Sequence, residues 1–102
     1  MARFDVYRFA NKAAPFVVDV QADLLGDLAS RVVVPLAPAA RFAKEELPRL
    51  KPRIPIDGED YILMTTDIGV LAKAQLGMPV TNIETDHRDD ITAALDFLFQ
   101  GF

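Results

Sequence analysis

Few side chains in this sequence have the types and spacing that enzymatic chemistry requires. The 102 residues include one histidine, His87, one serine, Ser30, and no cysteine. A serine nucleophile needs a neighbouring base that a carboxylate orients, and no such Ser-His-Asp constellation can be assembled here. The lack of cysteine excludes disulfides, thiol nucleophiles and thiolate metal ligands. We therefore expect no catalytic residue and a protein that is not an enzyme.

The acidic residues around His87 are the only candidates for a cation site. Asp86, Asp89 and Asp90 surround it, but acids in the first turn of a helix are explained by the helix dipole. No second histidine supports a metal site, so His87 is expected to be a surface or capping residue. The glycines are scattered and form no phosphate-binding loop. We expect neither a metal nor a cofactor.

Charge is distributed unevenly along the chain. The net charge of −4 argues against bare nucleic acid as the main partner. A basic segment nevertheless occupies the middle of the sequence, and its members are Arg41, Lys44, Arg49, Lys51 and Arg53. From Asp57 onward there are nine acidic residues and only two basic ones. The basic segment is interpreted either as a solvated loop face or as a docking surface for an acidic partner segment.

The last stretch, Asp86–Phe102, is the strongest structural signal. Thr85 or Asp86 can cap a helix start, and apolar residues then recur at helical spacing. The stripe consists of Ile91, Ala94, Leu95 and Leu98. Gly101 is a reasonable stop signal, and the sequence ends on an aromatic residue. Chain ends are usually polar, so Phe99 and Phe102 either pack on the protein's own core or contact a partner.

Short strands are predicted upstream of this helix. Arg3–Phe9 and Phe16–Gln21 alternate in polarity and suggest an antiparallel hairpin. Further strands are expected at Arg31–Leu36, where Pro35 indicates an edge or a bulge, and at Tyr61–Thr66, with Asp57-Gly58 as a hairpin turn before it. Shorter extended pieces are expected at Arg53–Ile56, Gly69–Gln75 and Val80–Ile83, and only Ala39–Leu47 can form a short helix or turn.

The order of these elements predicts the fold class. We expect one domain over residues 1–102, mainly β with one C-terminal helix, in which a small antiparallel sheet or barrel packs against that helix. No apolar run approaches 18 residues, and the N-terminus lacks a basic-then-apolar signal pattern. A cytoplasmic protein without a membrane partner is expected.

Four stretches of the sequence resemble signature segments of the CcdB family of toxins. They are Phe16–Leu25, Arg31–Ala37, Met64–Ile68 and Asp90–Phe102, and they occur in the family's order across the whole chain. The resemblance implies a CcdB-like fold, a small antiparallel sheet related to SH3-like barrels with one C-terminal helix. It also implies a cytoplasmic homodimer that is the toxin of a type II toxin–antitoxin pair and functions in plasmid maintenance.

The resemblance also implies partners and their sites. Family members bind the A subunit of DNA gyrase, a topoisomerase, and trap it on cleaved DNA. A disordered CcdA-type antitoxin tail neutralises them, and the complex, rather than the toxin alone, binds operator DNA as a transcription repressor. By position, the gyrase-binding residues are Leu24, Leu25, Phe99, Gln100, Gly101 and Phe102. The antitoxin is expected to prefer the basic segment.

Gln100 stands where the family has a tryptophan, and this leaves three functions open. Tryptophan supplies a large flat contact surface that glutamine lacks. The protein is either an active gyrase poison, a CcdB-like protein that binds antitoxin but no longer poisons gyrase, or a toxin with another target.

Overall fold

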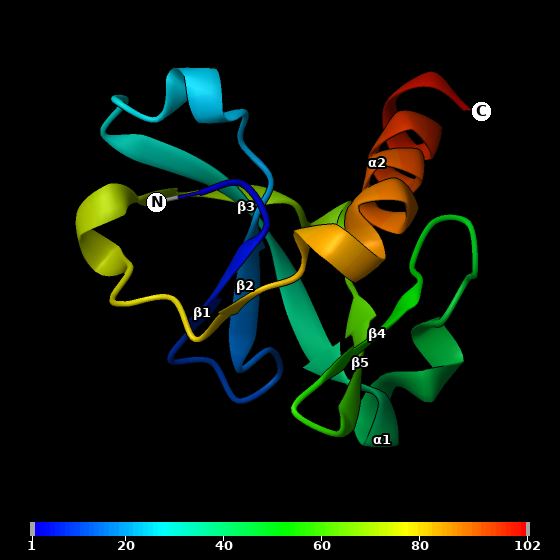
Figure 1. The fold of residues 1–102 in the computed structure, drawn as a ribbon. Coiled ribbons are helices and arrows are strands. Elements are labelled where there is room, and N and C mark those ends of the chain that lie inside the picture. Colours follow the sequence, from blue (N-terminus) through cyan, green and yellow to red (C-terminus); the bar gives the residue numbers. More distant parts are fainter. Residues whose placement is uncertain (1, 102) are drawn as a thin grey trace.

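The computed structural model describes residues 2–101, which form one curled antiparallel sheet and one long helix (Figure 1). The strands are β1 (Asp5–Arg8), β2 (Phe16–Asp19), β3 (Ser30–Pro38), β4 (Arg53–Ile56), β5 (Glu59–Leu63), β6 (Gly69–Ala72) and β7 (Thr81–Asn82). Their order across the sheet is β4-β5-β3-β2-β1-β7, and β6 pairs with β3. The predicted class, mainly β with a C-terminal helix, is confirmed.

β3 is the central strand, and Pro35 lies where its outer neighbour changes. One side of β3 pairs with β2. The other side pairs with β6 along Ser30–Val33 and then with β5 along Leu36–Pro38. The Pro35 carbonyl accepts a hydrogen bond from the Met64 amide at 2.9 Å. Pro35 therefore lies at the break between two neighbours rather than on an edge strand, and its missing N–H falls where the ladder is interrupted.

The two predicted hairpins are confirmed. β1 and β2 pair antiparallel, with Val6 opposite Val18. β4 and β5 are joined by Asp57-Gly58, whose φ angles are 51° and 82°. Two consecutive left-handed residues make the tight turn that matches the twist of a two-stranded ribbon.

Alternation along β1 and β2 buries both faces of the sheet. Phe4, Val6 and Val18 belong to the main core, whereas Tyr7 and Val17 belong to a smaller cluster on the other face. A strand directs successive side chains to opposite faces, so these memberships follow from the sequence period. The helix covers the main core, because Ile91 and Ala94 on its stripe are fully buried there.

This helix, α2 (Glu84–Gln100), begins earlier than the sequence predicts. The Asn82 side-chain oxygen accepts a hydrogen bond from the Glu84 amide at 2.9 Å, so neither Thr85 nor Asp86 caps the start. The first turn therefore contains Glu84 and Asp86, and the expectation that Asp89 and Asp90 lie in that turn is wrong. Gly101 ends the helix as expected.

Short helical turns connect the strands and shorten some predicted ones. They are η1 (Asp23–Leu25), α1 (Ala39–Phe42), η2 (Ala43–Glu45), η3 (Thr65–Asp67) and η4 (Lys73–Gln75). The strands predicted at Tyr61–Thr66 and Gly69–Gln75 thus end at Leu63 and Ala72, where η3 and η4 begin soon after. The extended piece predicted at Val80–Ile83 is reduced to β7. The short helix expected within Ala39–Leu47 is confirmed by α1 and η2.

Candidate partner-binding site

The C-terminal end of α2 projects from the body of the protein. Gly101 has a φ of +80°, and its amide donates to the Phe97 carbonyl at 3.0 Å, which closes the last turn. A left-handed residue in this position favours glycine, because a side chain would be strained there. Phe99 in this last turn is 70% exposed, and Gln100 is also exposed. We call Phe99, Gln100 and Gly101 the tip.

Exposure decides between the two interpretations of Phe99. A phenyl ring packed on its own core would be largely buried, and the ring of Phe99 is not. The described part of the tip is therefore available for contact with a partner. Phe102, the other aromatic residue in the prediction, lies outside the described residues.

A second group of exposed apolar side chains lies on the loop that contains η1. Leu24 is 93% exposed and Leu25 is 48% exposed, and Leu28 on the same loop is exposed as well. Sequence reasoning named the first two only through the family resemblance and missed Leu28. A leucine among aspartate, glycine and serine residues was the available signal. Figure 1 places η1 and the end of α2 along the same edge of the molecule.

Hydrogen bonds hold this leucine loop in place although its leucines are exposed. The Asp23 carboxylate accepts from the Arg3 amide at 2.7 Å, and the Gln21 side-chain amide donates to the Leu25 carbonyl at 3.0 Å. On the far side, Lys73 Nζ donates to the Gly26 carbonyl at 3.2 Å. The leucines are therefore presented by an ordered backbone.

A buried ion pair lies at the base of the loop. Arg31 Nη2 and Nε lie 2.7 and 2.8 Å from Asp19 Oδ2, and both side chains are fully buried. Burial raises the pKa of the Asp19 carboxyl, while hydrogen bonds from the Gln21 amide and from Arg31 act in the opposite direction. A Cβ at Gly26 would lie 3.8 Å from Arg31 Nη1, so the loop backbone passes close to the guanidinium.

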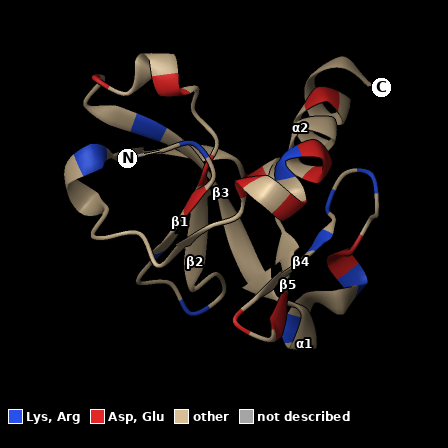
Figure 2. Cartoon of the chain, in the orientation of Figure 1, with Lys and Arg blue, Asp and Glu red and all other residues tan. Residues whose placement is uncertain are grey.

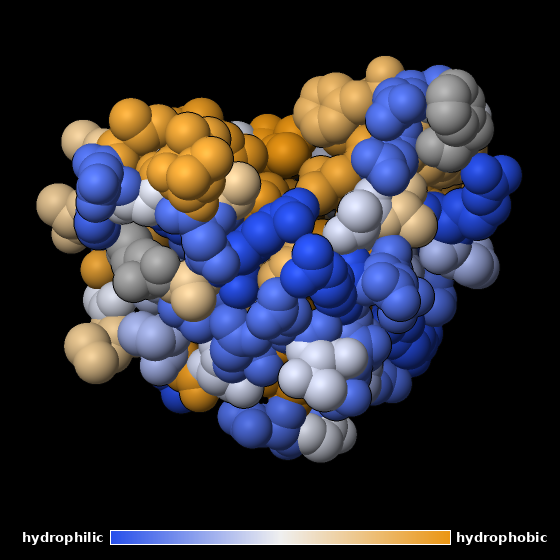
Figure 3. Space-filling view, turned by 45° about the horizontal axis from the view of Figure 1, so that its top comes forward, coloured by the Kyte–Doolittle hydropathy of each residue, from blue (hydrophilic) through white to orange (hydrophobic). Residues whose placement is uncertain are grey.

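These apolar side chains belong to one end of the molecule. Figure 3 shows apolar surface gathered there, continuing through a hollow toward the end of α2. β6 lies beside the leucine loop, because the Lys73 amide donates to the Ala29 carbonyl, and it adds Val70, which is 65% exposed. Exposed apolar residues that cluster in this way mark an interaction surface.

The basic segment is less uniformly cationic than its sequence suggests. Lys51 pairs with Glu45 at 3.1 Å, and Arg53 pairs with both Glu46 at 2.9 Å and Asp60 at 3.2 Å. Arg41 donates to the Lys12 carbonyl at 3.4 Å, and Lys44 is exposed on η2. Figure 2 shows the mixture of positive and negative charge along this part of the chain.

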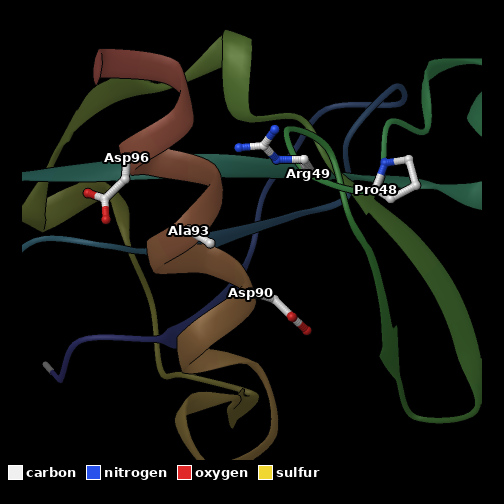
Figure 4. A pocket seen from close by; sticks show the side chains of 5 residues that line it. All are labelled: Pro48, Arg49, Asp90, Ala93 and Asp96. Atoms are coloured by element: carbon white, nitrogen blue, oxygen red, sulfur yellow. The ribbon is translucent and has the colours of Figure 1, made fainter. Parts of the chain in front are cut away.

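Arg49 is the member of the basic segment that faces α2. It lies on the loop between η2 and β4 and borders a groove of about 340 Å³, which Pro48, Asp90, Ala93 and Asp96 also line (Figure 4). Its guanidinium carbon lies 4.3 Å from the centre of the Phe97 ring. Acidic and basic side chains share this groove, so it does not have the single charge sign that favours a simple ionic ligand.

The histidine and the acidic residues that sequence analysis considered for a cation site all lie on α2. His87 Nδ1 lies 3.5 Å from Asp90 Oδ2, one turn along α2. The His87 side chain is only 16% exposed and does not cap the helix, so the expectation of a surface or capping residue is wrong. Within residues 2–101, no group of three or more histidine, cysteine or carboxylate side chains is placed to hold a metal ion. None of the helices described is both long and apolar enough to span a bilayer.

The comparison with protein families agrees with this arrangement of one sheet and one C-terminal helix. The family model described as "CcdB protein" matches residues 3–101, which is nearly the whole chain. Members of that family are non-enzymatic toxins of toxin–antitoxin systems. The match covers the leucine loop, the basic segment and all of α2. The chain therefore belongs to the CcdB family.

Proposed function

We propose that this protein is a toxin that binds the A subunit of DNA gyrase through its tip and traps the enzyme on cleaved DNA. The observation that carries the proposal is the 70% exposure of Phe99 at a helix end that Gly101 terminates cleanly. An aromatic ring held on the last turn of a helix can enter a pocket of a partner at low entropic cost. Such anchors supply most of the binding energy at protein interfaces.

The leucine loop is the second part of the proposed gyrase-binding surface. The η1 turn, which contains the exposed Leu24 and Leu25, lies along the same edge of the molecule as the end of α2. In a homodimer with two-fold symmetry the same apolar patch would serve both subunits. We propose that Leu28 and Val70 contribute to pairing with a second copy, while Leu24 and Leu25 remain available to the target.

A second candidate function rests on Gln100. A glutamine side chain offers far less apolar area than the family's tryptophan, and burial of its amide requires hydrogen-bond partners. A protein with the same fold that binds antitoxin without poisoning gyrase, or that has another target, would retain every contact described for residues 2–101. Exposure of Phe99 favours the active poison, since an aromatic side chain exposed at a helix end is typical of a surface that contacts a partner.

We propose that a disordered CcdA-type antitoxin binds the basic segment and that the complex, in the cytoplasm, binds operator DNA. The ion pairs sharpen this prediction. Lys51 and Arg53 are already neutralised by local carboxylates, and Arg49 lies over the Phe97 ring, so Arg41 and Lys44 are expected to contribute most to binding an acidic segment.

Induced expression in two host strains tests the function. One strain carries a sensitive gyrase and the other a gyrase whose A subunit resists poisons of this family. Active poisoning predicts growth arrest that the resistant gyrase relieves. Arrest in both strains would mean another target, and growth of both strains with soluble protein present would mean that poisoning is lost.

A matched pair of variants assigns the effect to the tip. Phe99→Ser removes the exposed ring of the tip, and we expect it to abolish the arrest. Met78→Ser removes an apolar side chain that is even more exposed, 86% on the segment before β7, and should leave the arrest intact. Loss of arrest with both variants would indicate a general effect on folding or solubility.

A further inference from the structure

We infer that Arg49 is a positioning residue for the tip and acts through the ring of Phe97. This inference rests on the proposed function of the tip and assigns a role to a residue on a distant part of the chain. The cation of Arg49 lies 4.3 Å from the centre of the Phe97 ring, well within the range of a cation–π contact.

The loop that carries Arg49 is built to hold it still. The Leu50 amide donates to the Leu47 carbonyl at 3.0 Å, and Pro48 occupies the second position of this turn, where proline is favoured. The Lys51 amide donates to the same Leu47 carbonyl, and an isolated β-bridge joins Leu47 to Lys51. Arg49 therefore extends from the apex of a closed turn.

Both arms of this turn are tied down. Before it, Glu45 and Glu46 form ion pairs with Lys51 and Arg53, which follow it. After it, the Pro52 carbonyl accepts from the Leu63 amide at 3.0 Å, which anchors the chain to β5. Figure 4 shows the Arg49 side chain directed from this turn toward α2.

Phe97 links Arg49 to the last turn of α2. Its carbonyl accepts the hydrogen bond from the Gly101 amide that ends α2. Its side chain lies outside the apolar stripe of Ile91 and Ala94 and is only partly buried, so the core alone does not fix it. The Arg49 guanidinium covers this ring and thereby restrains the turn from which Phe99 extends.

Two carboxylates add negative charge to the groove beside the Arg49 cation. Asp90 and Asp96, about two turns apart on α2, line the same groove as Arg49. Their negative charge favours a guanidinium over the adjacent ring, and the delocalised planar group stacks on an aromatic face better than an ammonium does. The same turn with a neutral side chain at this position would lose both the stacking and the charge attraction.

Amide hydrogen exchange at the end of α2 tests the inference without gyrase. In Arg49→Gln we expect the amides of Phe99, Gln100 and Gly101 to exchange roughly two- to fivefold faster, the factor typical of a partly exposed cation–π contact. Arg49→Lys should recover part of that protection. Arg41→Gln makes the same charge change in the same segment, far from α2, and should change none of these amides.

A double-mutant cycle with Phe97→Leu isolates the contact. Once the ring is absent, Arg49→Gln should have no further effect on exchange at the tip. An equal effect of Arg49→Gln with and without the ring would overturn the inference, and so would unchanged exchange in Arg49→Gln alone.

Gyrase cleavage separates this inference from the proposed function. Positioning predicts that Arg49→Gln weakens trapping of cleaved DNA in parallel with the faster exchange. Weaker trapping with unchanged exchange would make Arg49 a direct contact of gyrase and would overturn the positioning role. Faster exchange in a protein that never traps gyrase would support the positioning role while refuting gyrase as the target.

Discussion

Replacement of Asp19 by asparagine removes the negative charge from the buried pair that supports the leucine loop while keeping the size of the side chain. Asp19 and Arg31 are both fully buried, and two guanidinium nitrogens lie within 2.8 Å of one carboxylate oxygen. Asparagine retains an oxygen that can accept from the Gln21 amide, which now donates to Asp19 at 3.0 Å. The guanidinium, in contrast, becomes a buried charge without a counterion.

The expected cost follows from that imbalance. Removal of one partner from a buried ion pair costs about 3–5 kcal/mol, because the remaining charge cannot regain its hydration. For a domain of about 100 residues each kcal/mol lowers the melting temperature by about 4–8 °C. We therefore expect Asp19→Asn to lower the melting temperature by roughly 12–40 °C. That loss is a large part of the roughly 5–15 kcal/mol by which a domain is stable.

Urea unfolding at one fixed protein concentration measures this cost, since dimerisation would make the midpoint depend on concentration. Two further variants serve as controls. The double variant Asp19→Asn/Arg31→Met removes both charges and should recover much of the loss. Arg88→Gln breaks the exposed Arg88–Glu84 pair and should cost about 0.5 kcal/mol or less.

Two results would refute the reasoning. One is a loss below about 1 kcal/mol in Asp19→Asn, which would mean that Arg31 finds hydration or another partner. The other is a double variant as unstable as the single one, which would assign the effect to packing rather than charge.

Three further predictions concern other parts of the molecule. Burial, helped by nearby carboxylates, raises the pKa of Tyr7 to about 12. The resulting stabilisation is complete below the unfolded pKa of 10.0 and is lost as the pH rises toward 12. The unfolding free energy of the natural protein should therefore fall by about 3 kcal/mol at alkaline pH, and that of Tyr7→Phe should not. The same alkaline loss in both proteins would show that Tyr7 ionises freely when folded. Gly101→Ala should lower the free energy of unfolding by about 1–2 kcal/mol in thermal unfolding, because φ at this position is +80° and a Cβ is strained there. An unchanged melting temperature would indicate that the last turn rearranges at no cost. Affinity for a CcdA-type antitoxin segment, measured by calorimetry between roughly 50 and 500 mM salt, should fall as the salt concentration rises. Lys44→Gln should weaken binding more than Arg53→Gln does, since Arg53 already has two carboxylate partners. An affinity that does not depend on salt would contradict an ionic docking surface.

Periodicity and turn chemistry were sufficient to predict the framework of the fold. The alternation of Phe4 and Val6 against Asp5 and Tyr7 predicted the first strand, and Asp57-Gly58 marked its own hairpin, because both signals arise from neighbouring residues. The start of α2 was misplaced because its N-cap is Ile83, and the oxygen that accepts from its first amide belongs to Asn82, which lies on β7. That strand exists only through pairing with β1, a contact between the two ends of the chain.

The candidate site was predictable only in part, because it also depends on contacts between residues far apart in the sequence. The sequence indicated an apolar chain end and a basic segment, but it did not indicate which of them were exposed or already paired. The ion pairs of Arg53 connect it to Glu46 and Asp60, and the contact of Arg49 with Phe97 joins residues almost half the chain apart. Such contacts depend on how the loop after η2 folds against α2, and no local pattern encodes them.

The central claim, that the tip poisons gyrase, is tested most directly by a DNA-cleavage assay with purified gyrase, ATP and this protein. The natural chain should produce cleaved complexes, Phe99→Ser should produce none, and Gln100→Trp should produce more by restoring a large flat contact surface. Cleavage with the Gln100→Trp variant but not with the natural chain would contradict the claim and would leave a sound scaffold with a silenced tip.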